Sequence, residues 1–78
     1  HRALLAARES WQSGERSADT LRARMRAELS EEPLAEPEYV SVADAVTLRE
    51  LATIDGPALM SMAVRLGATR LIDNDLLD

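Results

Sequence analysis

The segment 58–66 carries an apolar residue at every second position, with no polar residue among them: Met60, Met62, Val64 and Leu66. This alternation is typical of a strand that buries one face. Gly67 and Ala68 follow at once, and glycine at the first central position suits a type II′ turn between two antiparallel strands. The sequence therefore predicts a hairpin whose apolar face needs a cover from elsewhere in the chain.

A first helix is predicted over residues 3–13, where apolar residues recur at helical spacing. They form one stripe: Leu4, Ala7 and Trp11. Gly14 is well placed to end this helix as a left-handed cap. Because no capping residue precedes the stripe, we expect an exposed, frayed terminus at His1.

A second helix is predicted over residues 18–30, with Ser17 as its capping residue. Its apolar positions again form a single stripe: Ala18, Leu21, Met25 and Leu29. A short turn that contains glycine joins the two helices, so residues 1–30 are expected to form an antiparallel helical hairpin. The two stripes together can cover the apolar face of a sheet.

Residues 31–37 are predicted to be a linker, because prolines and glutamates there oppose regular structure. The remaining residues, 38–78, are predicted to form an antiparallel sheet. Its three strands are expected at 39–46, 58–66 and 69–74.

The predicted turn at Gly67 sets the register of the last two strands. Val64 should then lie opposite Leu71, and Met62 opposite Asp73. The whole pattern predicts an α+β fold with the order α-α-β-β-β, in which a two-helix hairpin packs on a three-stranded antiparallel sheet.

Composition limits the class of protein. The 78 residues allow one small domain, 1–78, and the absence of cysteine excludes disulfides and thiolate metal sites. A single histidine argues against a structural zinc site. No apolar run approaches the roughly 18 residues of a membrane helix, so a soluble, cytoplasmic protein without a membrane partner is expected.

Nucleic acid is not expected as a partner, because the net charge is −5. The first 26 residues nevertheless hold six arginines and only three acids, and Arg22, Arg24 and Arg26 could form an electrostatic footprint. Trp11 is the only aromatic residue near them, so they lack a stacking platform for bases. An ordinary solvated helix face is the simpler interpretation.

Patterns of catalytic residues are missing from the sequence. The three glycines stand apart from one another, there is no cysteine nucleophile, and no second histidine could complete a base or ligand set. Asp73 and Asp75 lie two apart on a predicted strand and could hold a hard cation, but solvated acids at a strand end are more common. No catalytic, cofactor-binding or metal-binding residue is therefore predicted.

Two blocks of sequence carry a family resemblance. The first is EYVSVADAVTL at 38–48, and the second is MAVRLGATRLIDN at 62–74. Their order and spacing resemble the C-terminal domain of the pantoate–β-alanine ligases, also called pantothenate synthetases. Ser41 stands where that family often has a glutamate, and this departure affects no catalytic residue.

The resemblance implies that the chain is one domain of a longer enzyme. Members of the family join pantoate to β-alanine through a pantoyl-adenylate, using ATP with magnesium. Their catalytic motifs lie in an N-terminal nucleotide-binding domain, which would be the partner of this chain, and the parent enzyme would be a homodimer. The resemblance implies a lid over that active site, inactive alone and without a cofactor of its own.

An independent protein-interaction or dimerisation module is the alternative. It would use the bare third strand and the face lined by Met60 and Met62. In either case Arg70, Asp73 and Asn74, in the second block, are candidates for structural or domain-interface roles. If Asp73 binds buried partners, Asp73→Ala should destabilise the fold by about 1–3 kcal/mol.

Overall fold

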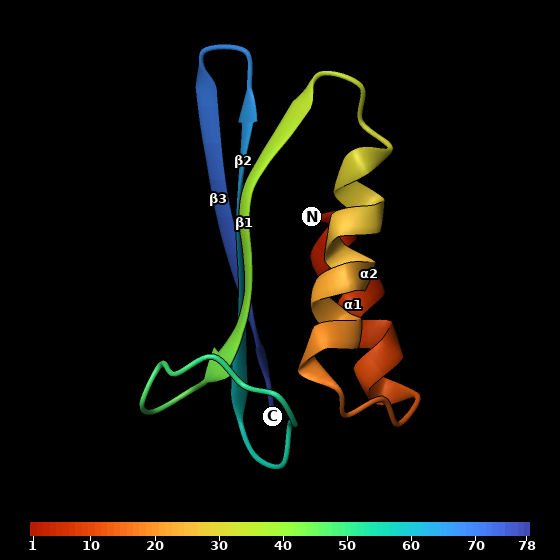
Figure 1. The fold of residues 1–78 in the computed structure, drawn as a ribbon, viewed down its shortest axis with the longest axis vertical. Coiled ribbons are helices and arrows are strands. Elements are labelled where there is room, and N and C mark those ends of the chain that lie inside the picture. The colour runs from red at the N-terminus through yellow and green to blue at the C-terminus, as the bar shows by residue number, and fades with distance from the viewer.

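The chain runs through two helices and then three antiparallel strands, which confirms the predicted order and the α+β class. The computed structural model describes all 78 residues. The elements, drawn in Figure 1, are α1 (Arg2–Gln12), α2 (Ala18–Ser30), β1 (Ala35–Asp44), β2 (Ala58–Leu66) and β3 (Thr69–Leu77).

Helix α1 buries Leu4 and Ala7 of its predicted stripe, and also Ala3, each at most 3% exposed, whereas Trp11 is only partly buried against the core. The prediction of an uncapped, frayed start was wrong. The Nδ1 atom of His1 accepts a hydrogen bond from the backbone N–H of Ala3 at 3.0 Å, so the imidazole satisfies one of the free donors of the first turn. Gly14 follows the helix with a φ of +108°, a conformation that suits glycine.

Helix α2 begins as predicted. The Ser17 hydroxyl accepts a hydrogen bond from the N–H of Thr20 at 3.3 Å, which caps the first turn. All four residues of the predicted stripe are fully buried: Ala18, Leu21, Met25 and Leu29. The helix therefore turns a continuous apolar side toward α1 and the sheet.

The sheet has the order β1-β2-β3, and its register agrees with the sequence-based prediction. Met62 pairs with Asp73, and Val64 pairs with Leu71. Gly67 has a φ of +61° whereas Ala68 has no positive φ, as expected for a type II′ turn.

Two strands differ in length from the prediction. β1 begins at Ala35, inside the segment 31–37 that was predicted to be a linker, because Pro37 lies where its missing N–H does not stop the pairing with Val64. β1 also ends earlier, at Asp44. β3 continues to Leu77, three residues beyond the predicted end, because Leu77 pairs with Ala58 and returns to the core.

The core lies between the helices and one face of the sheet, as the two layers in Figure 1 show. Met60 and Met62 are at most 1% exposed in this core. The helices of the chain itself thus cover the methionine face, which confirms the predicted core packing, and the alternative use of this face as a binding surface is not supported.

The connection from β1 to β2 is also tied to the helices. Residues 17 and 53 form an antiparallel bridge, and the N–H of Ile54 donates to the carbonyl of Arg16 at 2.8 Å. Ile54 itself is buried in the core. Neither helix has the length and apolar composition that crossing a bilayer requires.

Candidate functional site

One face of the sheet has no helix against it. The helices lie on a single side in Figure 1, and strand residues that alternate with the buried ones point to the other side. Three large apolar side chains on that side stay partly exposed: Tyr39 at 37%, Ile72 at 58% and Leu76 at 47%. We call this side of the sheet the open face.

A β-bulge places a charged cluster at the hairpin end of the open face. The register of β1 shifts between Pro37 and Tyr39, which makes Glu38 the extra residue and re-aims its side chain. Its carboxylate lies 2.5 Å from Arg70 Nε and 3.7 Å from Arg65 Nη2. The hydrogen bond from Arg70, with a smaller contribution from Arg65, lowers the pKa of the Glu38 carboxyl.

This cluster gives Arg70 a structural role that links the three strands. Arg65 and Arg70 are direct cross-strand partners, and like charges in that position repel each other. Glu38 offsets the repulsion, and Glu36 adds a second acid on the same face as the cross-strand partner of Arg65. The hairpin end of the open face therefore holds two arginines and two glutamates, with no net charge.

Asn74 lies in a polar row across the middle of the open face. Ser41 pairs with Ser61 across β1 and β2, and Ser61 pairs with Asn74 across β2 and β3. The exposed Asn74 side chain makes no hydrogen bond within the chain; only its backbone N–H is bonded, to the Asp73 carboxylate. Asn74 is thus available on the open face for contacts to another molecule or domain.

Asp73 points to the opposite side of β3 from Arg70 and Asn74, so the three predicted residues do not form one site. Its carboxylate accepts a hydrogen bond from the N–H of Asn74 at 2.9 Å. Half of the side chain remains exposed. Since no buried partner would be left unpaired, the expected cost of Asp73→Ala falls below about 1 kcal/mol.

Asp75 binds an arginine. Arg8 Nε on α1 lies 2.7 Å from Asp75 Oδ2, and Arg8 Nη2 also donates to the carbonyl of Leu76. The hydrogen bond from Arg8 lowers the pKa of the Asp75 carboxyl. Because Asp75 is paired with Arg8, it is not free to hold a cation together with Asp73.

The turn that follows β1 is tightly organised, and we call the segment Asp44–Arg49 the tip loop. The Asp44 carboxylate accepts hydrogen bonds from the N–H groups of Val46 and Thr47, each at 2.8 Å, and these bonds, chiefly the one from Thr47, lower its pKa. At the far end of the loop the carbonyl of Arg49 accepts from the N–H of Asp44 at 2.8 Å. The loop is thus held in a defined conformation.

The tip loop presents apolar side chains to solvent. Val46 is 88% exposed and Leu48 is 63% exposed. Leu48 has a φ of +62°, which is uncommon for a residue with a Cβ. In Figure 1 the loop extends away from the helices, on the side of the open face.

Arg22 holds the base of the tip loop to helix α2. Its guanidinium donates to the carbonyls of Val42 at 2.9 Å and Leu51 at 2.6 Å, and it also binds Glu50 and Asp19. The same Glu50 carboxylate accepts a hydrogen bond from Ser41. With only 17% of its side chain exposed, Arg22 serves the fold and is not part of a basic surface for nucleic acid.

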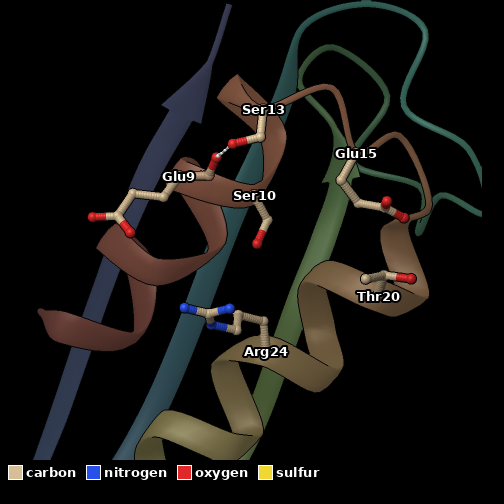
Figure 2. Close-up of a pocket in the computed structure, with 6 residues that line it drawn as sticks. All are labelled: Glu9, Ser10, Ser13, Glu15, Thr20 and Arg24. Atoms are coloured by element: carbon tan, nitrogen blue, oxygen red, sulfur yellow. Dashed lines mark hydrogen bonds between the residues drawn. The ribbon is translucent and has the colours of Figure 1, made fainter.

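A polar groove lies between the two helices (Figure 2), with a volume of about 380 Å³. Six residues line it, none of them hydrophobic: Glu9, Ser10, Ser13, Glu15, Thr20 and Arg24. Several of these groups already serve the local backbone: Ser13 donates to the carbonyl of Glu9, and Glu15 accepts from the N–H of Ser17. The groove has the character of a solvated space between helices.

Sequence reasoning missed the network of Arg22 and the shape of the tip loop. The loop had a readable signal, because aspartate followed three residues later by threonine is typical of a turn in which the carboxylate accepts backbone N–H bonds. Arg22 had none, since its partners Glu50 and Leu51 lie 28 and 29 residues away in sequence. Only the fold brings them together.

The chain matches the family model described as pantoate-beta-alanine ligase over residues 1–76. Among curated relatives, the pantothenate synthetase of Chloroflexus aggregans is 63% identical over 79 residues, and that of Roseiflexus castenholzii is 54% identical over 77 residues. Each match covers 99% of this chain but 28% of the relative. The chain therefore spans little more than a quarter of the length of these relatives.

A solved structure agrees with the sequence matches. The crystal structure of pantothenate synthetase from Thermus thermophilus superposes with a TM-score of 0.85 at 32% identity. The superposition covers 94% of this chain and 26% of the Thermus chain. The two helices and the three-stranded sheet thus recur as one part of a larger protein.

Proposed function

The chain belongs to the pantoate-beta-alanine ligase family, and we propose that it is the part of such a ligase that covers the active site. In this proposal the catalytic residues lie in a separate nucleotide-binding part of the same enzyme. The observation that carries it is the extent of the match: nearly the whole chain aligns, but only with 28% of each relative. The rest of the relatives' length leaves room for a catalytic part.

The proposed reaction of the complete enzyme joins pantoate to β-alanine. The pantoate carboxylate first attacks ATP, with magnesium, to form a pantoyl-adenylate and release pyrophosphate, and the amine of β-alanine then displaces AMP. In this proposal ATP and magnesium bind to the other part of the enzyme. No three of the His, Asp and Glu side chains in this chain form a possible metal site, and its three glycines are isolated in sequence.

A cover has a physical purpose in a reaction of this kind. An acyl-adenylate is destroyed by water, so an enzyme gains from excluding water while the intermediate waits for its amine. That task requires a stable scaffold with a surface for docking, and it requires no reactive side chain. The core between helices and sheet supplies such a scaffold, and the open face leaves a surface free for contact.

The partner in this proposal is therefore the nucleotide-binding part of the same enzyme. A homodimeric parent and a cytoplasmic location remain predictions from the family resemblance. The alternative of an independent interaction module loses its main surface, because Met60 and Met62 are buried. At its second surface, the outer edge of β3, Arg8 already binds one backbone group, the carbonyl of Leu76.

An activity assay tests the proposal. The 78-residue chain alone, given ATP, magnesium, pantoate and β-alanine, is expected to form no pantothenate. The enzyme that joins this chain to a family catalytic part should form it. Turnover by the chain alone, or none by the joined enzyme, would contradict the proposal.

A further inference from the structure

The open face and the tip loop form one continuous surface. The loop leaves β1 at the end of the sheet and extends to the side away from the helices, so it borders the open face (Figure 1). The row nearest this border pairs Leu59 with Leu76 across β2 and β3, and Leu76 is 47% exposed. Apolar side chains thus extend from the sheet to the exposed Val46 and Leu48.

The tip loop is held in one shape although that shape is unfavourable for the backbone of Leu48. Leu48 keeps a left-handed backbone conformation that glycine would adopt more easily, and its side chain remains in solvent. The hydrogen bonds of Asp44 and Arg49 hold the loop in that shape. An exposed leucine in a strained, well-fixed loop adds little to the stability of this chain. Its apolar side chain would stabilise a complex in which a partner covers it.

We propose that this surface docks onto the nucleotide-binding part of the same enzyme, with Leu48 and Ile72 as its apolar anchors. The inference rests on the proposed function and adds the face through which the cover closes. Family relatives extend far beyond the matched 28%, so a large part of the same polypeptide is available as the occupant. The other side of the sheet cannot serve, because the helices bury it.

The two ends of the open face differ in polarity, and this difference indicates how the partner is oriented. The hairpin end carries two arginines and two glutamates, whereas the loop end is apolar. A complementary partner therefore has polar groups opposite this charged cluster and an apolar patch opposite Leu48. Asn74, between the two ends, can donate and accept hydrogen bonds with the partner backbone.

The test uses the complete enzyme with a single substitution in this chain. Ile72→Ser removes an anchor, and Leu5→Ser is the matched control, because Leu5 on α1 is 57% exposed and Ile72 is 58% exposed. Leu48→Gly removes the second anchor and also suits the φ of +62°. If Leu48 served only the fold of this chain, Leu48→Gly would lower the melting temperature, whereas an anchor role predicts an altered reaction without a lower melting temperature.

The readout is the amount of AMP released for each pantothenate formed. Water that reaches the pantoyl-adenylate attacks its carbonyl carbon, breaks the bond to the phosphate oxygen, and yields pantoate and AMP without pantothenate. We expect equal amounts of AMP and pantothenate from the wild type and from Leu5→Ser. We expect an excess of AMP from Ile72→Ser and Leu48→Gly, without a fall in the melting temperature of Leu48→Gly.

Two results would overturn the docking surface. One is an equal yield of AMP and pantothenate in both anchor variants. The other is a change of oligomeric state in the anchor variants by light scattering, which would assign the surface to a second copy of the chain. A wild-type enzyme that forms no pantothenate would instead refute the proposed function, so the two failures are distinguishable.

Discussion

The two faces of the same sheet differ in what they contribute. The face toward the helices buries Met60, Met62 and Val64, each at most 1% exposed. The open face leaves Ile72 and Leu76 about half exposed, although the residues alternate along the same strands. The face toward the helices therefore supplies the stability of the fold, and the residues of the open face can serve contacts with a partner.

The largest expected effect lies in the buried face. Met60→Ala should lower the free energy of unfolding by about 2–5 kcal/mol, because it removes buried contacts and leaves a cavity. Ile72→Ala on the open face should lower it by less than about 1 kcal/mol, since much of that side chain is already in water. Urea denaturation of the two variants measures the difference, and equal losses would break the comparison.

Arg22 and Arg24 show the same contrast between a largely buried side chain and an exposed one, here for charged residues. Arg22→Ala should cost about 2–3 kcal/mol of unfolding free energy, because the carbonyls of Val42 and Leu51 lose their shared donor. The control is Arg24→Ala, two residues along the same helix, where the exposed side chain makes no ion pair. That variant should stay within about 0.5 kcal/mol of the wild type by denaturant unfolding. A similar loss in both would refute the stabilising role of Arg22.

A pH dependence is expected from Asp75, on the helix side of β3. Arg8 lowers its pKa in the folded state below the value of about 3.9 in the unfolded chain. The resulting stabilisation is complete above that value and is lost as the pH falls through the folded pKa. Asp75 is 34% exposed, so screening limits the effect to about 1 kcal/mol. Urea unfolding of Asp75→Asn should show a shallower fall in acid, and parallel curves would contradict the assignment.

The smallest effect is expected on the open side, at the tip loop. Leu48→Gly relieves the left-handed backbone of a residue with a Cβ but adds freedom to the unfolded chain. The net change should be neutral or stabilising by up to about 1 kcal/mol, measured as a shift of the thermal melt. A marked destabilisation would mean that Leu48 serves the fold instead of a contact.

Local patterns were sufficient to predict the fold. The helical stripes predicted α1 and α2 within one residue at each end, and the Met60–Leu66 alternation with Gly67 predicted the hairpin and its register. The errors fell where pairing overrides local preference. Pro37 suggested a linker although an edge strand tolerates it, and β3 was predicted to end at residue 74 although its pairing with β2 continues to Leu77.

The open face and the tip loop were harder to predict from the sequence than the fold. Arg70, Asp73 and Asn74 were predicted together because they fall in one block of family-like sequence, but the alternation of a strand separates Asp73 from the other two. The open face is defined by where the helices are absent, which no local pattern encodes. Leu48 looks like an ordinary apolar residue until its positive φ and exposure are known.

Side-chain footprinting of the complete enzyme with ATP and pantoate bound tests the central claim most directly. In this chain Leu48 is 63% exposed and Leu5 is 57% exposed, so hydroxyl radicals should label two free leucines at comparable rates. If the open face and tip loop dock on the catalytic part, Leu48 and Ile72 should be protected, and Leu5 should be labelled freely. Protection of Leu5 with free labelling of Leu48 and Ile72 would contradict the account.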